Sequence, residues 1–240
     1  MKKKIKFLFF IIYIFFTNHI NLYGDELFFE GEEIQILDEG NKLISKKNVK
    51  VTSNNGLILE GEIFEYDKKK SELVLSDNVI ITDLKKNIII KTDKIEYLKK
   101  NEKLITYNFT EINISNNYSI ESKNIVFDRN AGILQSNTNS LITDKHNNKI
   151  LSNNFKFFSE DRLIKAKNVV IEDNQGNKTI LENFIADLDN DQFYGKDVKI
   201  NFNKNIFNNS DNDPRLYGNT ISSTRNKSEI NKGVFSTCKK

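Results

Sequence analysis

The sequence predicts an all-β fold built from repeats of about 30 residues, and three observations lead to this prediction. Apolar and polar residues alternate with a period of two over short stretches rich in Val, Ile, Tyr and Phe, as is typical of half-buried strands. Two sets of residues recur along the chain at nearly constant spacing. The only proline is Pro214, so no repeat contains a residue that would remove a hydrogen-bond donor from a sheet.

Residues 1–24 have the pattern of a cleaved export signal. Four lysines precede an unbroken apolar run from Phe7 to Phe16, and a polar stretch then leads to Gly24. This run is too short to span a bilayer, which needs about 20 apolar residues. We therefore predict a signal peptide that is removed after Gly24, and an exported protein.

The charge balance argues against a nucleic-acid partner. Four of the 36 basic residues and none of the 33 acidic residues lie in residues 1–24, so 32 basic residues face 33 acidic residues in the rest of the chain. Nucleic-acid binding depends on a basic patch, and the sequence after residue 24 shows none.

The repeated residues define one domain. The first set is an Asn or Asp followed by a branched apolar residue, and its clearest copies begin at Asn48, Asn78, Asn168 and Asp197. The second set is aromatic, with spacings of 31, 30 and 30 residues, and consists of Tyr66, Tyr97, Phe127 and Phe157. Because both sets keep the same period, we interpret residues 25–202 as one repetitive β domain.

Polar clusters mark the expected turns between strands. Asn and Gly tolerate the positive φ that tight hairpins need, and we expect turns at Ser53–Gly56, Asp67–Ser71, Lys145–Lys149 and Asp173–Asn177. The polar break at Ser76–Asn78 predicts one more turn. Each repeat is therefore expected to hold two longer or three short strands. Beyond Phe202 the alternation weakens, and we predict that residues 203–240 are a connector.

The sequence contains no recognisable catalytic or metal-binding set, and we expect neither an enzyme nor a cofactor. His146 is the only histidine after residue 24. It has no evident partners for a zinc site or a catalytic triad, and we interpret it as a solvated turn residue. Asp187–Asp191 begins like a calcium-binding loop, but the required Gly and Glu at the sixth and twelfth positions are Gln192 and Val198. We predict an exposed acidic hairpin there.

The candidate site consists of the apolar residues that occupy the same alternating positions along each strand and therefore face one side of the sheet. They would line a groove if two sheets part enough to hold acyl chains, and they would close an ordinary core otherwise. A slip of one residue exchanges the two faces of a strand, so the selection depends on the phase of each strand. The selected residues are Val49, Val51, Leu57, Leu59, Ile63, Leu73, Leu75, Val79, Ile81, Ile88, Ile90, Ile125 and Phe127.

The Asn-Val strands, the aromatic residues and the period resemble the OstA-like periplasmic domains of lipopolysaccharide (LPS) transport, which include LptA-like bridge proteins. Such domains are β-jellyrolls, V-shaped and twisted stacks of short antiparallel strands whose interior holds lipid A acyl chains. The tail Gly233–Cys238 is similar to the junction between this domain and the outer-membrane barrel in alphaproteobacterial LPS-assembly proteins (LptD). By that resemblance residues 203–240 lead towards a barrel absent from this sequence, where Cys238 would find a disulfide partner.

The resemblance implies a function in LPS transport and outer-membrane assembly. The domain would receive LPS acyl chains from a periplasmic bridge protein of similar fold, bound edge strand to edge strand, and pass them to an outer-membrane translocon. It would lie at the periplasmic face of the outer membrane, with an outer-membrane lipoprotein as partner if the barrel exists. Three alternatives stay open: a stand-alone periplasmic bridge protein, an exported structural or adhesive β-protein, and a β-helical carbohydrate-active enzyme.

Overall fold

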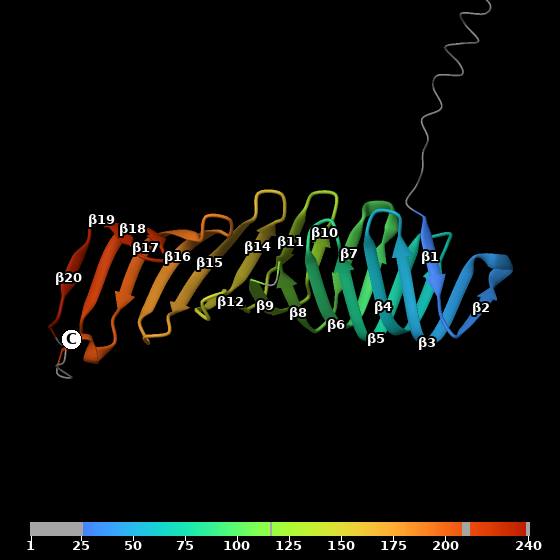
Figure 1. Cartoon of the computed structure of the whole chain (residues 1–240), viewed down its shortest axis with the longest axis horizontal. Helices are drawn as coiled ribbons and strands as arrows, with labels where there is room; N and C mark the ends of the chain where they lie inside the picture. The colour runs from blue at the N-terminus through green and yellow to red at the C-terminus, as the bar shows by residue number, and fades with distance from the viewer. Residues whose placement is uncertain (1–25, 116, 208–211, 239–240) are drawn as a thin grey trace, which may run out of the picture.

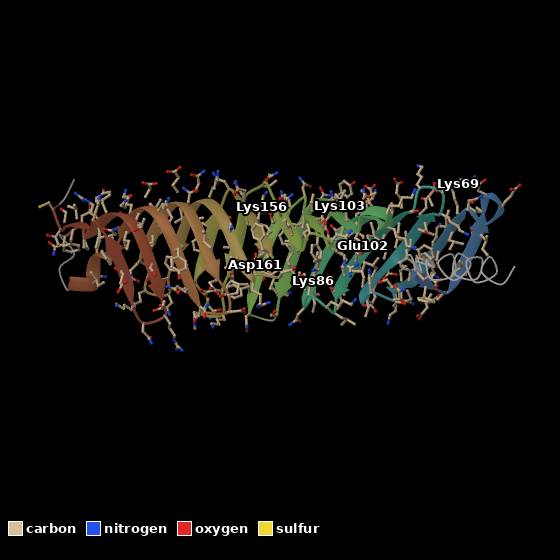
Figure 2. The ribbon with its side chains drawn as sticks, turned by 90° about the horizontal axis from the view of Figure 1, so that it is seen from above. Lys69, Lys86, Glu102, Lys103, Lys156 and Asp161 are labelled. Atoms are coloured by element: carbon tan, nitrogen blue, oxygen red, sulfur yellow. The ribbon has the colours of Figure 1, made fainter. Side chains whose placement is uncertain are left out.

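The protein is a long, twisted stack of antiparallel strands (Figures 1 and 2). The computed structural model describes residues 26–115, 117–207 and 212–238, and the predicted signal peptide lies outside the described residues. All 20 strands of this part belong to one hydrogen-bonded sheet. Its other elements are three short 3-10 helices, η1 (Asp38–Gly40), η2 (Lys99–Asn101) and η3 (Lys204–Phe207). The structure confirms the predicted all-β fold.

The strands follow one another along the stack in chain order. One end holds β1 (Leu27–Glu30), β2 (Glu33–Leu37), β3 (Lys42–Ser53), β4 (Leu57–Asp67), β5 (Glu72–Asp83) and β6 (Ile88–Leu98). The middle holds β7 (Lys103–Thr106), β8 (Phe109–Ile114), β9 (Tyr118–Lys123), β10 (Val126–Asp128), β11 (Ile133–Ser136), β12 (Ser140–Thr143), β13 (Lys149–Ser152) and β14 (Asn154–Phe158). The other end holds β15 (Leu163–Glu172), β16 (Lys178–Asp187), β17 (Gln192–Asn201), β18 (Arg215–Thr224), β19 (Ser228–Asn231) and β20 (Val234–Ser236).

The short strands of the middle are halves of longer crossings of the stack. The first half of β6 pairs with β8 and its second half with β7. The two rows continue through β9 and β10 and rejoin at β15, which pairs with both β13 and β14. We call each crossing a traverse. The chain is therefore an antiparallel meander of traverses, and the predicted repeat of about 30 residues corresponds to two of them.

The turns between traverses alternate between two margins of the stack. The first margin contains the turns at residues 54–56, 84–87, 144–148 and 173–177. The second margin contains the turns at residues 68–71, 99–102, 129–132, 159–162 and 188–191. The two margins are opposite ends of each traverse. Nevertheless Asp83 at the first margin is in contact with Arg129 at the second margin. The two halves of the traverses therefore fold towards each other and enclose the apolar core between them.

The repeated Asn and Asp residues lie where the traverses bend. Asn48, Asn78, Asn168 and Asp197 have φ of 47, 56, 51 and 56°, and the valine after each of them is buried. Asn and Asp adopt this left-handed conformation more readily than branched residues do. The predicted turn at Ser76–Asn78 was wrong, because these residues form a bulge inside β5 where its register with β6 shifts. The predicted turns at the four other polar clusters are confirmed.

Replacement of Asn168 by valine is expected to lower the free energy of unfolding by about 1–2 kcal/mol, because a branched side chain disfavours positive φ. Asn168→Gly should cost much less, since glycine adopts this conformation freely. Urea unfolding followed by circular dichroism measures both. Asn183→Val, at a residue of β16 outside the set with positive φ, is the matched control. Equal losses in the two valine variants would contradict this explanation of the repeat.

The sheet continues beyond residue 202, where a connector was predicted. β18 pairs with β17 along nearly its whole length, and β19 and β20 pair with its two halves. Leu216, Ile221 and Ile230 still pack against the core, while polar residues occupy many of the other positions. This polar content explains why the alternation is weak in the sequence.

Candidate functional site

The predicted lining residues lie in the N-terminal half of the core. Twelve of the thirteen are buried, with 2% exposure or less, so this section of the interior is filled by its own side chains. Ile63 is the exception. A bulge shifts the register of β4 just before it, so Phe64 and Tyr66 take the inward positions and Ile63 lies opposite Lys46 on the other face. The inward assignment of Ile63 was wrong because simple alternation does not continue through a bulge.

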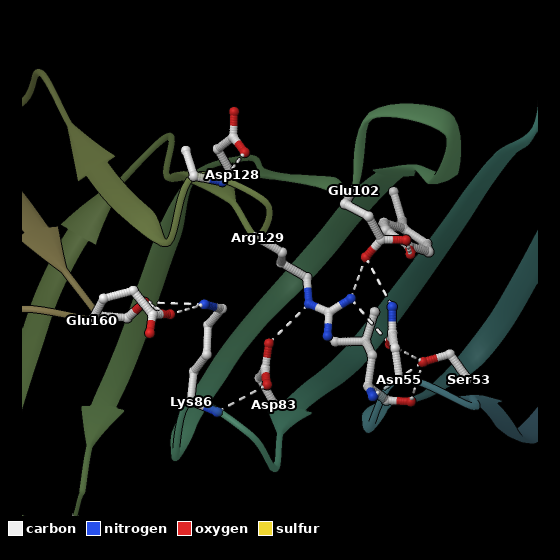
Figure 3. A network of polar contacts seen from close by, with 12 residues as sticks. Ser53, Asn55, Asp83, Lys86, Glu102, Asp128, Arg129 and Glu160 are labelled. Atoms are coloured by element: carbon white, nitrogen blue, oxygen red, sulfur yellow. Dashed lines mark hydrogen bonds and ion pairs between the residues drawn. The ribbon is translucent and has the colours of Figure 1, made fainter. Parts of the chain in front are cut away.

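A buried polar cluster joins the two margins over this filled section (Figure 3). Arg129 of the second margin donates from Nε to Asp83 Oδ2 at 2.8 Å and from Nη1 to Asn55 Oδ1 at 3.2 Å, and both acceptors lie at the first margin. Its Nη1 also donates to Glu102 Oε2. Asn55 Nδ2 donates to the same Glu102 oxygen at 3.2 Å. We call these four residues the Arg129 clasp.

The clasp satisfies its buried charges internally. The side chains of Arg129 and Asp83 are 6% and 1% exposed, and Tyr97 donates a 2.6 Å hydrogen bond to the second oxygen of Glu102. Burial alone would lower the pKa of Arg129, but the hydrogen bond and charge of Asp83 and the charge of Glu102 outweigh it and raise that pKa. Arg129 therefore carries a positive charge that holds two carboxylates from opposite margins together.

Two further links join the margins. Lys86 Nζ of the first margin donates to Glu160 Oε1 at 2.7 Å and to Ser159 Oγ at 3.2 Å (Figure 3). Further along, His146 Nε2 lies 2.9 Å and Lys145 Nζ 3.2 Å from Asp191 Oδ2. Burial would raise the pKa of Asp191, but its hydrogen bonds to His146 and Lys145 lower it.

His146 does lie in the turn between β12 and β13, as predicted, but the prediction missed its contact with the acidic hairpin. No sequence signal indicated this contact, because His146 and Asp191 are 45 positions apart and belong to different margins.

Beyond the His146–Asp191 link the interior opens into a groove of about 790 Å³. Tyr118, Asp144, His146 and Asp191 lie at its closed end. The turns at residues 173–177 and 224–227, one from each margin, provide the polar rim. The apolar wall consists of Ile150, Ile171, Phe184, Ala186, Phe193, Ile200, Phe202, Ile221 and Ile230. This is the candidate binding site, and none of the predicted lining residues contributes to it.

Side-chain hydrogen bonds hold together two loops of the first margin, 144–148 at the closed end of the groove and 173–177 in its rim. Asp144 Oδ1 accepts from the backbone N–H groups of His146 and Asn148, while Asn148 Nδ2 donates to Asp144 Oδ2 at 2.7 Å. Asp173 and Asn177 repeat this arrangement in the next loop, with a corresponding side-chain hydrogen bond of 2.8 Å. An apolar wall below a fixed polar rim suits a ligand with an apolar body and a polar head.

Tyr118 sets the chemistry of the closed end. Burial, followed by the charges of Asp191 and Asp144, raises the pKa of Tyr118 to about 12. Like an ordinary tyrosine its hydroxyl is protonated near neutral pH, so it can donate a hydrogen bond at the boundary between the groove and the filled section, and the raised pKa extends this state to alkaline pH.

The groove could have been sought in the sequence from the size of the inward side chains. Ala186 and Ser223 line it where the preceding traverses carry larger residues such as Phe157 and Leu134. Small residues at inward positions leave volume unfilled. The strongest apolar alternation in the sequence belongs to the filled section instead.

In the part of the chain that the structure describes, no cluster of three or more His, Cys, Asp and Glu side chains is placed to hold a metal ion. Within the same residues no helix has the length and apolar character needed to cross a membrane. Cys238 is exposed and forms no disulfide bond in the structure.

No family model and no curated protein matches the sequence. Several solved structures align with the chain, and two of them are described here. LptH of Pseudomonas aeruginosa, the LptA-homologous periplasmic component of a lipopolysaccharide transport device, is 7% identical over 59% of this chain and 82% of its own, with a TM-score of 0.26. The wild-type TCP10 domain of Danio rerio CPAP, in complex with a peptide of STIL, is 12% identical over 84% of this chain and 98% of its own, with a TM-score of 0.21. At these TM-scores neither alignment supports a functional assignment.

Proposed function

We propose that this protein is an exported carrier of LPS that shields the acyl chains in its groove and performs no catalysis. The observation that carries the proposal is the groove itself, a space of about 790 Å³ between the two halves of the sheet that combines an apolar wall with polar side chains at its rim and closed end. The acyl chains would lie against the apolar wall and the sugars would stay outside the rim. The resemblance of the sequence repeats and tail to OstA-like domains directs the choice of LPS among amphiphilic lipids.

The hydrophobic effect provides the affinity in this proposal. Each methylene that leaves water for the groove contributes about 0.8 kcal/mol. The volume lies within the range of about 300–1,000 Å³ that is usual for ligand sites. The groove can therefore shield part of a multi-chain lipid, and no energy-coupling site is needed for binding itself.

The two ends of the stack are the proposed partner surfaces. The outer strands β1 and β2 expose Phe28 and Ile36, and β20 at the other end exposes Val234 and Phe235. Outer strands of a sheet accept a further strand through their free backbone groups. In the proposed arrangement one end pairs with a bridge protein of similar fold. The other faces an outer-membrane translocon and its lipoprotein partner, at the periplasmic face of the outer membrane.

Ala186→Leu should weaken LPS binding about tenfold, because displacing two methylenes from the groove costs about 1.6 kcal/mol and 1.4 kcal/mol corresponds to a factor of ten. The measurement is displacement of a fluorescent fatty acid from the purified protein by LPS. Ala131→Leu, at an exposed turn residue, is the matched control and should bind like the unmodified protein. Failure of LPS to displace the probe would refute the proposal, and equal affinities of the two variants would place the lipid elsewhere.

A further inference from the structure

We propose that the Arg129 clasp holds the N-terminal half of the interior shut, so that acyl chains occupy only the C-terminal groove until the clasp opens. This inference rests on the proposed function and adds a location and a gate to it. The interior would have two sections, a filled section that holds the inward residues of β3 to β8 and of β10, and an open one that begins at Tyr118 on β9.

The filled section leaves no room for a chain in its present form. Inward residues such as Leu75, Ile81 and Ile90 are at most 1% exposed, and they pack against their counterparts across the fold. A lipid can enter this section only if the two halves of the sheet move apart. Such a movement must separate the first margin from the second.

The clasp is placed to resist that separation. Asp83 ends β5 at the first margin, whereas Glu102 and Arg129 lie in turns of the second margin. Parting the margins breaks the Arg129–Asp83 and Asn55–Glu102 contacts, and the bulges that interrupt the ladders of β3 to β6 are the places where each traverse can bend. Lys86 adds a second link close by, at the surface (Figure 3).

The groove and the filled section differ in the contacts between their two margins. The Asp191 link to Lys145 and His146 marks its closed end. Past this link the two margins face each other as the polar turns 173–177 and 224–227, with the apolar wall between them. The Arg129 clasp and the Lys86 link thus lie over the filled section, whereas the Asp191 link lies where the groove begins.

Methyl NMR of the unmodified protein tests the location directly. Stearic acid with a nitroxide near its methyl end serves as the probe, and the isoleucine methyl groups report its distance. Resonances of Ile150, Ile171 and Ile221 should broaden, whereas those of Ile81 and Ile90 should keep their full intensity. Broadening of the latter pair would overturn the inference while the proposed function stands. Absence of broadening at every isoleucine would overturn both.

A clasp variant tests the gate. The triple change Asp83→Asn, Glu102→Gln and Arg129→Gln removes the charges and keeps polar groups of similar shape. In this variant the probe should also broaden Ile81 and Ile90. Lys86→Gln should produce the same change to a smaller extent. This single variant keeps the gate testable if the triple variant does not fold.

The control is Lys50→Gln, which removes an ion pair with Glu60 on the outer face and should leave the pattern unchanged. If Ile81 and Ile90 keep their intensity in Lys86→Gln and in a folded triple variant, the links are not a gate. If Lys50→Gln gives the same spread as the clasp variants, loss of any surface charge suffices and the assignment to the clasp is wrong.

Discussion

Arg129→Met is expected to lower the free energy of unfolding by about 3–5 kcal/mol, because it leaves the Asp83 and Glu102 carboxylates buried without a compensating charge. Asp83 is 1% exposed in its side chain, so water cannot replace the lost guanidinium without opening the fold. Urea unfolding at neutral pH, with the slope checked for two-state behaviour, measures the loss.

Two further variants separate the effect of unpaired buried charges from that of a lost surface ion pair. Lys50→Met removes one partner of an exposed ion pair and should cost about 1 kcal/mol or less. Replacing Asp83, Glu102 and Arg129 together by apolar residues of similar volume should restore much of the stability that Arg129→Met loses, since no unpaired charge remains. An Arg129→Met loss no larger than that of Lys50→Met would show that the clasp does not stabilise the folded protein.

Phe127→Ala should lower the free energy of unfolding by about 3–5 kcal/mol, the usual cost of removing a buried aromatic ring. Phe127 is 1% exposed and lies on β10, a strand of three residues held between β7 and β11. β7 and β11 are each hydrogen-bonded to a further strand, so they can move little to fill the cavity that the alanine leaves.

The matched control is Phe109→Ala, because Phe109 is 52% exposed at the start of β8 and should contribute less than about 1 kcal/mol. Thermal and urea unfolding of the two variants should therefore differ clearly. Similar losses would mean that the aromatic residues recur along the chain for a reason other than core packing.

The sequence was sufficient to predict the strands, most turns and the period at which aromatic residues recur. Tyr97, Phe127 and Phe157 are buried on every second traverse, because an aromatic ring on the inward face of each repeat packs into the core of the stack. The period was right as well, although its second marker has a different physical origin. Asn48 and Asn78 recur because the backbone needs positive φ at the bends.

The groove and the clasp could not be predicted in the same way. Alternation shows which residues face inwards, but it does not show whether their volumes fill the space between two halves of a sheet. Contacts such as Asp83–Arg129 and Lys86–Glu160 join residues 46 and 74 positions apart. They depend on how far the two halves fold together, which short-range patterns do not specify. Ile63 was misplaced for a related reason, since the bulge before it changes the phase within one strand.

The alternation of turns between the margins constrains how such a chain can grow or shrink in evolution. An insertion of one traverse, about 15 residues, would exchange the margins of every later turn and would move Arg129 to the side where Asp83 already lies. An insertion of two traverses would keep every later turn at its own margin and lengthen the stack by about 10 Å, given the usual spacing of neighbouring strands. Length variation among related chains should therefore come in steps of about 30 residues, and an engineered duplication of one such unit should fold while half a unit should not.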